Sequence, residues 1–156
     1  IRDRNHLAGL LIGKYYRAKE LGIELVFDPA CHVETLPSSL SHNEWISIVG
    51  NLLDNAYNAT LRQPTGSRQI ECLINSEGDE AIVEIADQGC GIDESLRDRI
   101  FERGVTSSDS GDHGIGLWLV RSYVEQAGGN IVVDNNIPFG TIFTLYIPLT
   151  RDEHHG

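Results

Sequence analysis

The sequence is poor in sulfur and in long apolar runs. Its 156 residues include no methionine and three cysteines, Cys31, Cys72 and Cys90, whose number and spacing fit neither a disulfide framework nor a zinc site. We therefore expect reduced thiols and a cytoplasmic protein. No apolar run approaches the ~20 residues that cross a bilayer, and no segment has the pattern of a signal peptide. The chain starts at Ile1, so we expect a piece of a longer protein.

Positive charge is also scarce. Twelve Lys and Arg residues stand against 23 Asp and Glu, which gives a formal net charge of −11. A general nucleic-acid-binding protein needs a basic surface to displace counterions from phosphates, and an anionic membrane attracts the same kind of surface. We therefore expect neither nucleic acid nor a membrane as a partner of this chain. One small anionic ligand stays open, because a metal ion and backbone N–H groups neutralise phosphate locally.

What the sequence does contain is the hydrophobic patterning of one globular domain. Helices are predicted over residues 5–21, 41–61, 94–100 and 114–127, strands over 23–27, 69–75, 80–86, 130–134 and 141–148, and a loop over 103–113. The clearest local signal is the capping box of Ser41 and Glu44 at the start of the second helix. Short turns join most strands. This predicts an α+β fold: a two-layer α/β sandwich with a mixed, mostly antiparallel sheet and helices packed on one face.

The long second helix has two dissimilar faces. Apolar residues between Trp45 and Thr60 recur on one side, which is the expected core stripe. The opposite side carries Asn51, Asn55 and Asn58 at spacings of three and four. Each asparagine costs roughly 0.5–0.7 kcal/mol of helix propensity relative to alanine, so three in one row favour a functional surface over a merely solvated face. Their amide oxygens suit a hard cation such as Mg²⁺.

Two glycine-rich segments carry further candidate binding residues. Asp87, Gly89 and Gly91 follow a predicted strand, where the glycines let the backbone approach a ligand and the carboxylate accepts a hydrogen bond from an amino group. Gly114 and Gly116 open the last predicted helix, whose N-terminal N–H groups can bind anionic oxygen. Taken alone, each segment is equally compatible with an ordinary turn. The second segment is not a Walker A loop, because no Gly-Lys-Ser/Thr follows.

Together, these motifs resemble the catalytic domains of histidine kinases, in the gyrase, histidine kinase and mismatch-repair ATPase superfamily. The asparagine-bearing helix and residues 87–91, 100–104, 113–117 and 140–141 match the N, G1, F, G2 and G3 boxes of that family in order. The chain looks most like the citrate and C4-dicarboxylate sensor kinases. The resemblance implies the Bergerat fold.

The resemblance also implies a division of the chain. Residues 1–22 resemble the end of the second dimerisation helix, residues 23–149 form the catalytic ATP-binding domain, and residues 150–156 are a frayed tail. None of the six histidines has the acceptor pattern, so we expect the acceptor histidine upstream of this chain. The implied partners are ATP, that dimerisation domain and a response regulator. We expect a monomeric fragment of a homodimeric sensor, on the cytoplasmic side of a membrane.

The resemblance assigns roles to individual residues. Asn55 is the implied Mg²⁺ ligand, Asn51 lines the same site, both belong to the catalytic set, and Asp87 reads the adenine amino group. The implied nucleotide-binding residues are Asn51, Asn55, Asn58, Asp87, Gly89, Gly91, Ile92, Phe101, Gly104, Thr106, Ser107, Gly114, Ile115, Gly116, Leu117 and Thr141.

Position 51 indicates the type of reaction. Hydrolysing members of the superfamily carry a general-base glutamate there, whereas an asparagine amide takes no proton at neutral pH. This favours phosphoryl transfer to a protein histidine, in which positioning and charge neutralisation do most of the catalysis.

Two alternatives stay open at this point. One is a serine kinase of the anti-sigma-factor type, and the other is a nucleotide-gated interaction module without turnover. Two departures from the family pattern bear on the second: Asn58 stands where many members have lysine, and Asp112 replaces the first glycine of the usual triplet.

Overall fold

The computed structural model describes residues 2–33, 35–63, 68–102 and 113–149 of the chain. In chain order the elements are α1 (Arg2–Glu20), β1 (Glu24–Phe27), α2 (His42–Leu61), β2 (Gln69–Asn75), β3 (Glu80–Asp87), α3 (Glu94–Arg97), α4 (His113–Gln126), β4 (Asn130–Asn135) and β5 (Thr141–Pro148). Each matches a predicted element in type. The short helix α3 ends three residues before the predicted end, where the chain turns and buries Ile100. The predicted loop up to residue 112 and the tail from residue 150 lie outside the described residues.

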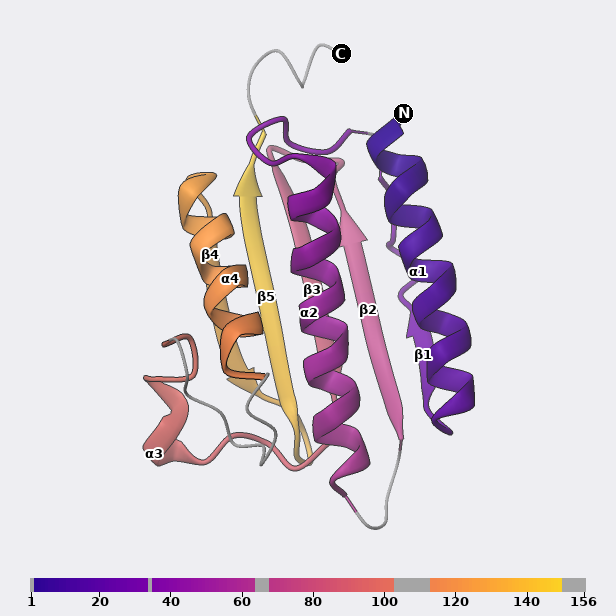
Figure 1. Cartoon of the computed structure of the whole chain (residues 1–156), viewed down its shortest axis with the longest axis vertical. Helices are drawn as coiled ribbons and strands as arrows, with labels where there is room; N and C mark the ends of the chain where they lie inside the picture. The colour runs from indigo at the N-terminus through magenta and orange to yellow at the C-terminus, as the bar shows by residue number, and fades with distance from the viewer. Residues whose placement is uncertain (1, 34, 64–67, 103–112, 150–156) are drawn as a thin grey trace.

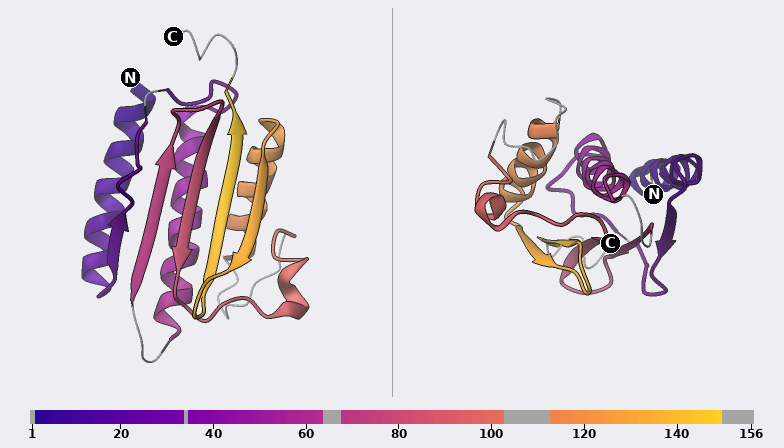
Figure 2. Two further views of the ribbon diagram at one scale, coloured as in Figure 1. Left: turned by 180° about the vertical axis from the view of Figure 1, so that it is seen from behind. Right: turned by 90° about the horizontal axis from the view of Figure 1, so that it is seen from below.

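The five strands form one mixed sheet with the order β1-β2-β3-β5-β4. Strands β1 and β2 are parallel, and the other neighbouring pairs are antiparallel. The helices α1, α2 and α4 all cover the same face of the sheet, as the end-on view in Figure 2 shows. The predicted two-layer α+β sandwich is therefore confirmed.

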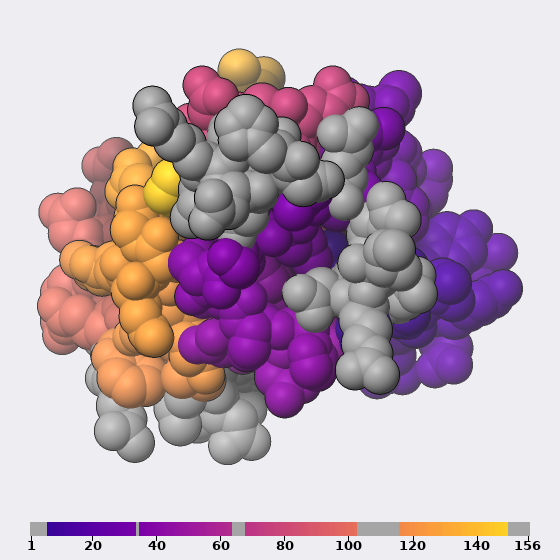
Figure 3. Space-filling model, turned by 90° about the horizontal axis from the view of Figure 1, so that it is seen from above, coloured from indigo at the N-terminus to yellow at the C-terminus, as the bar shows by residue number. Residues whose placement is uncertain are grey.

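The central helix α2 begins as its sequence predicts. The Ser41 hydroxyl accepts a hydrogen bond from the Glu44 backbone N–H at 3.2 Å, and the Glu44 carboxylate accepts one from the Ser41 N–H at 2.8 Å. This reciprocal pair satisfies two backbone donors that a helix start otherwise leaves open. Seen from above, α2 lies between α1 and α4 (Figure 3). The helix that carries the asparagine row is thus the middle of the helical layer.

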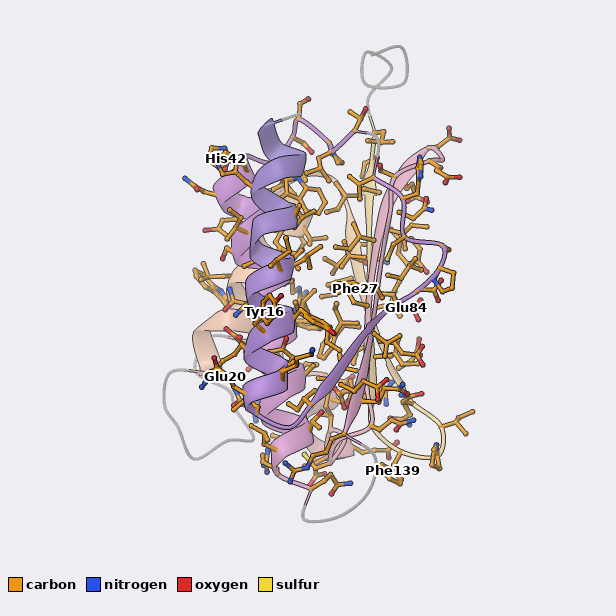
Figure 4. All side chains as sticks on the ribbon, turned by 90° about the vertical axis from the view of Figure 1, so that its right-hand side faces the viewer. Tyr16, Glu20, Phe27, His42, Glu84 and Phe139 are labelled. Carbon is orange, nitrogen blue, oxygen red and sulfur yellow. The ribbon has the colours of Figure 1, made fainter. Side chains whose placement is uncertain are left out.

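The core lies between α2 and the inward-facing side chains of the central strands. Its largest fully buried side chains include Trp45, Ile48, Leu52 and Leu53 of α2, Ile70 and Ile74 of β2, Ile85 of β3, and Phe143, Leu145 and Ile147 of β5. Burying each such side chain stabilises the fold by about 1.5–3 kcal/mol. The alternate residues of the strands, such as Glu84, lie on the face of the sheet away from the helices (Figure 4). The core therefore holds α2 along the central strands of the sheet.

Helix α1 packs against α2 and contributes to the same core. Leu7 and Ala18 are buried, the Lys14 ammonium pairs with the Asp54 carboxylate at 2.6 Å, and the Tyr57 hydroxyl donates to the Lys14 carbonyl at 2.7 Å. Burial is the main cause that raises the pKa of Tyr57 to about 12, so this hydroxyl stays protonated and able to donate. None of the described helices has the length and apolar character needed to cross a membrane.

Candidate functional site

Asp87 is a buried acid at the end of β3. Its side chain is only 1% exposed, and its Oδ1 atom accepts hydrogen bonds from the backbone N–H groups of Gly89 at 2.9 Å and Thr141 at 3.3 Å. Burial raises the pKa of this carboxyl to about 6, although both hydrogen bonds act to lower it. No described residue donates to the other oxygen, Oδ2. Above pH 6 the site thus presents one carboxylate oxygen that is free to accept a hydrogen bond.

The glycines around Asp87 are required by close backbone contacts. A Cβ atom at Gly89 would lie 2.5 Å from the backbone carbonyl carbon of Ala59 on α2, and Gly91 adopts a φ of +74°. Gly140 has a φ of +111°, and a Cβ atom there would collide with the Asp87 carbonyl oxygen. The turn after β3 is therefore pressed between the last turn of α2 and the start of β5.

Asn136 makes a contact that the sequence interpretation missed. Its side-chain amide nitrogen donates to the Asp87 carbonyl at 2.8 Å, and its backbone N–H donates to the Gly140 carbonyl at 3.0 Å. Its amide oxygen accepts from the Ile137 N–H at 2.8 Å. In the sequence, Asn136 lies in a segment that is typical of a simple turn between two strands. Only the packing of the turn against β3 distinguishes this asparagine from other turn residues.

The asparagine row of α2 meets the first turn of α4. Asn51, Asn55 and Asn58 are all half-buried, which is the face expected from the sequence. A Cβ atom at Gly116 would lie 3.0 Å from Asn51 Oδ1, so the backbone of α4 lies directly against this asparagine. The Asn51 amide also donates to the Ser47 hydroxyl at 3.1 Å. The Asn55 amide has no hydrogen-bond partner among the described residues.

Helix α2 connects these two groups of residues. Asn51 touches α4, and Ala59, eight residues further along the helix, touches the turn after Asp87. At a rise of 1.5 Å per residue, these two contacts are about 12 Å apart along the helix, with Asn55 midway. One side of the site therefore offers a carboxylate acceptor, the middle offers an amide oxygen, and the other side offers the start of a helix.

Other residues of the predicted set pack against the hydrophobic core or hold Asp87 in place. Ile92, Phe101 and Leu117 are half-buried and pack against the core, and the Phe101 ring meets the Phe143 ring edge-on at a centroid distance of 6.1 Å. Thr141 is buried and holds Asp87 through its backbone N–H. Gly104, Thr106 and Ser107 lie outside the described residues; Gly114 and Ile115 lie in the first turn of α4, where the Ile115 side chain is not described.

A comparison with known protein families identifies the family to which this sequence belongs. A sequence model of the family described as histidine kinase-, DNA gyrase B-, and HSP90-like ATPase matches residues 42–151, from the first residue of α2 to beyond the end of β5. The chain belongs to this ATPase family. Its ATPase region thus includes the asparagine row, Asp87 and the Thr141 contact, although the family match by itself assigns no role to any of them.

Sensor histidine kinases are similar to this ATPase domain over nearly its whole length. The sensor histidine kinase CitA of Klebsiella pneumoniae is 88% identical over 97% of this chain and 28% of its own length. The sensor histidine kinase DpiB of Escherichia coli K12 is 49% identical over 93% of this chain and 27% of its own length. A probable C4-dicarboxylate sensor kinase of Bacillus subtilis is 31% identical over 96% of this chain. The predicted likeness to citrate and dicarboxylate sensor kinases is confirmed, and the chain spans little more than a quarter of these relatives.

Solved structures confirm the fold of the ATPase domain. The catalytic domain of the histidine kinase ThkA superimposes with a TM-score of 0.74 over 96% of this chain and 94% of its own, at 22% identity. Full-length ShkA, solved in complex with AMPPNP, has a TM-score of 0.71 and 26% identity over 92% of this chain and 29% of its own.

Proposed function

We propose that this ATPase domain binds Mg·ATP and transfers the γ-phosphoryl group to a histidine on a dimerisation domain outside this sequence. The buried Asp87 carboxylate is the observation that carries the proposal. Its Oδ1 atom is held by two backbone N–H groups, so Oδ2 is oriented to accept a hydrogen bond from a ligand. The 6-amino group of adenine supplies that donor. Guanine presents a carbonyl oxygen at the same position, which a carboxylate repels.

Mg²⁺ is the proposed cofactor, with Asn55 as its protein ligand. The half-buried Asn55 amide has no described partner, and an amide oxygen is among the ligands that a hard cation accepts. No group of three or more His, Cys, Asp or Glu that could hold a metal occurs among the described residues. When bound, the cation neutralises charge on the phosphates. Its binding through one amide and the nucleotide fits the preference of Mg²⁺ for few protein ligands.

The start of α4 is the proposed phosphate-binding element. Its first backbone N–H groups have no intrahelical partner and carry the positive end of the helix dipole. The close contact of Gly116 with Asn51 supports this role, because it holds the helix start beside the asparagine row. Asn58 takes the position at which many family members have lysine. Phosphate neutralisation in this protein thus depends more on Mg²⁺ and on backbone donors.

Asn51 supports transfer to a protein rather than hydrolysis. A water molecule needs a general base to become nucleophilic, and a neutral amide does not accept its proton. A histidine acceptor attacks without that help: its imidazole nitrogen bonds to the γ-phosphorus while the bond to the β–γ bridging oxygen breaks and ADP leaves. Asn51 and Asn55 then act by positioning the phosphates in line with the acceptor.

The proposed partners follow from the relatives. CitA and DpiB are sensor histidine kinases, and this chain corresponds to about a quarter of each. We infer that the full-length protein is a homodimeric sensor whose cytoplasmic part includes this domain, and that its phosphoryl group passes to a response regulator. The complex of ShkA with AMPPNP supports an adenine nucleotide as the ligand of this fold.

A transfer assay tests the proposal. The domain is incubated with γ-labelled ATP, Mg²⁺ and a separately purified dimerisation domain of a citrate-type sensor kinase, and the label on protein is measured before and after acid treatment. A parallel titration measures ATP binding. Acid-labile label on the added domain is the expected result, because phosphohistidine hydrolyses in acid. The matched control is the same mixture with the acceptor histidine of the added domain replaced by glutamine.

Other outcomes contradict the proposal in distinct ways. Free phosphate without the acceptor identifies a hydrolase and overturns the role given to Asn51. Acid-stable label identifies a serine kinase of the anti-sigma-factor type. ATP binding with no label transfer to this acceptor, or to the dimerisation domains of other sensor kinases, points to a nucleotide-gated module.

A further inference from the structure

The turn between β4 and β5 lies against the end of β3, but its side chains do not hold it there by burial. Ile137 is 87% exposed and Phe139 is 43% exposed, and Phe139 lies at the outer edge of this end of the molecule (Figure 4). An exposed turn of this kind gains little from the hydrophobic effect. Its position must therefore come from hydrogen bonds and from close backbone contact.

Asn136 adds its own hydrogen bonds to the pairing of β5 with β3 and β4. Its amide nitrogen donates to the Asp87 carbonyl at 2.8 Å, while its amide oxygen accepts from the Ile137 N–H at 2.8 Å. The orientation of the amide is unambiguous, because a carbonyl only accepts and an N–H only donates. The Asn136 backbone N–H closes the turn by donating to the Gly140 carbonyl at 3.0 Å. One residue thus fixes the turn internally and joins it to the strand that ends in Asp87.

The contact continues to the Asp87 carboxylate. A Cβ atom at Gly140 would collide with the Asp87 carbonyl oxygen, so the two backbones lie in close contact, and the next residue, Thr141, donates its backbone N–H to Asp87 Oδ1 at 3.3 Å. The Gly89 N–H donates to the same oxygen at 2.9 Å. These two donors set the rotation of the carboxylate and hence the direction of Oδ2. Of the two, the Thr141 donor lies at the first residue of β5, directly after the turn and opposite Asp87 in the pairing of β3 with β5, so its position also depends on the turn.

We propose that Asn136 is a positioning residue for base recognition: it holds the β4–β5 turn on the Asp87 carbonyl, so that the Thr141 N–H orients the carboxylate toward the amino group of the base. The inference rests on the proposed role of Asp87 in reading adenine. Asn136 itself does not touch the nucleotide. Asn136 acts by directing Oδ2. Its loss should therefore reduce only the contribution of the 6-amino group to the binding free energy.

A comparison of two nucleotides isolates that part. ATP and purine riboside 5′-triphosphate differ only in the 6-amino group, so the ratio of their dissociation constants measures its contribution. We would determine both constants by calorimetry with Mg²⁺ for the wild type, N136A and N136D. N136D retains the acceptor for the Ile137 N–H but loses the donor to the Asp87 carbonyl. The variants N135A and D87N complete the set.

The expected results differ between the variants. In N136A and N136D the preference for ATP falls about three- to tenfold, as for a misaligned hydrogen bond to a charged acceptor. The affinity for the purine nucleotide stays within about twofold, because the phosphate contacts are unchanged. N135A is the matched control: the Asn135 side chain accepts from Arg97 of α3 at 2.8 Å and makes no hydrogen bond with Asp87, so the ratio is expected to stay at the wild-type value.

Two results would overturn the inference separately. If N136A and N136D weaken both nucleotides equally, or neither, Asn136 has only a structural role or none, and the role of Asp87 is unaffected. If D87N leaves the ratio unchanged, the base assignment itself is wrong and the role of Asn136 is lost with it. A melting curve of each variant excludes unfolding as the cause, and binding of the purine nucleotide reports an intact pocket.

Discussion

The two faces of α2 differ in burial and in polarity. Trp45, Leu52 and Leu53 on one face are at most 1% exposed and belong to the hydrophobic core. Asn51 and Asn55 on the other face are half-buried polar side chains with poor helix propensity. The first face stabilises the fold, and the second costs local stability in order to present amide oxygens. Stability and ligand binding should therefore separate cleanly along one helix, which the following substitutions test.

Truncating the core face should have the largest effect on stability. L53A removes a fully buried side chain and should lower the free energy of unfolding by roughly 2–5 kcal/mol, because the cavity is not refilled. Chemical denaturation monitored by tryptophan fluorescence measures this. The control is L61A, at a position on the same helix that is 36% exposed, where a change below about 0.5 kcal/mol is expected. Similar losses in both variants would show that α2 does not have two distinct faces.

Truncating the asparagine face should impair phosphotransfer and Mg²⁺ binding without lowering stability. N55A should lower phosphotransfer about 100-fold or more and remove the Mg²⁺ dependence of ATP binding, since the proposed metal ligand is lost. Its unfolding free energy should rise by up to about 0.7 kcal/mol, because alanine is the better helix former. Transfer of label and calorimetry with and without EDTA measure the first two effects. N43A, at an exposed position of the same helix, is the control. Full transfer by N55A would contradict the metal assignment.

Replacing Asp87 should affect ATP binding and stability in opposite directions. In D87N the amide oxygen has to accept from the Gly89 and Thr141 N–H groups, which turns the NH₂ group toward the adenine amino group. ATP affinity should fall about 10- to 100-fold as two donors then face each other. The free protein should melt at the same or a higher temperature at pH 7, because a buried charge is removed. D93N, at an exposed N-cap where asparagine is equally suitable, is the control.

Titration of Asp87 should change stability and ATP binding in opposite directions as the pH rises. Its pKa is about 6 in the folded protein against an ordinary value of 3.8, so the folded state binds more protons than the unfolded state between these values. The contribution of Asp87 to stability is therefore full below pH 3.8 and is lost as the pH rises through about 6. In the proposed mode of ATP recognition the carboxylate accepts the hydrogen bond of the base, so ATP binding should weaken as the pH falls below about 6. Melting curves and ATP titrations from about pH 4 to 8 should show both slopes in the wild type, and neither the stability step nor the binding step in D87N.

The smallest expected effect concerns a polar atom on the core face. Thr60 is 0% exposed, and its hydroxyl has no hydrogen-bond partner among the described residues. T60V replaces the hydroxyl by a methyl group of similar size and should raise the free energy of unfolding by about 1 kcal/mol. Thermal melts of the free protein measure this, with ATP affinity expected to stay unchanged. A clear destabilisation would show that the hydroxyl has a partner after all.

Most of the local structure could be predicted from the sequence. The capping box of Ser41, the spacing of the asparagines and the alternation in β2 and β3 are short-range patterns, and each appears in the structure where it was predicted. The contact that places Asn136 on Asp87 spans 49 residues, and nothing in the turn itself indicates it. The same holds for Gly116, whose backbone lies against Asn51 of another helix. Such contacts depend on the register and packing of elements that are far apart in the chain.

The sequence by itself determined which groups are available: a row of amides on one helical face, an acid at a strand end and glycines where the backbone turns. These follow from periodicity and backbone conformation, which act over a few residues. The tertiary structure alone decided what each group can do. Packing α2 and β5 around Asp87 buries the carboxyl, raises its pKa to about 6 and leaves one oxygen free. Burial and hydrogen-bond geometry belong to the assembled fold, because they are set by neighbours that only folding brings together.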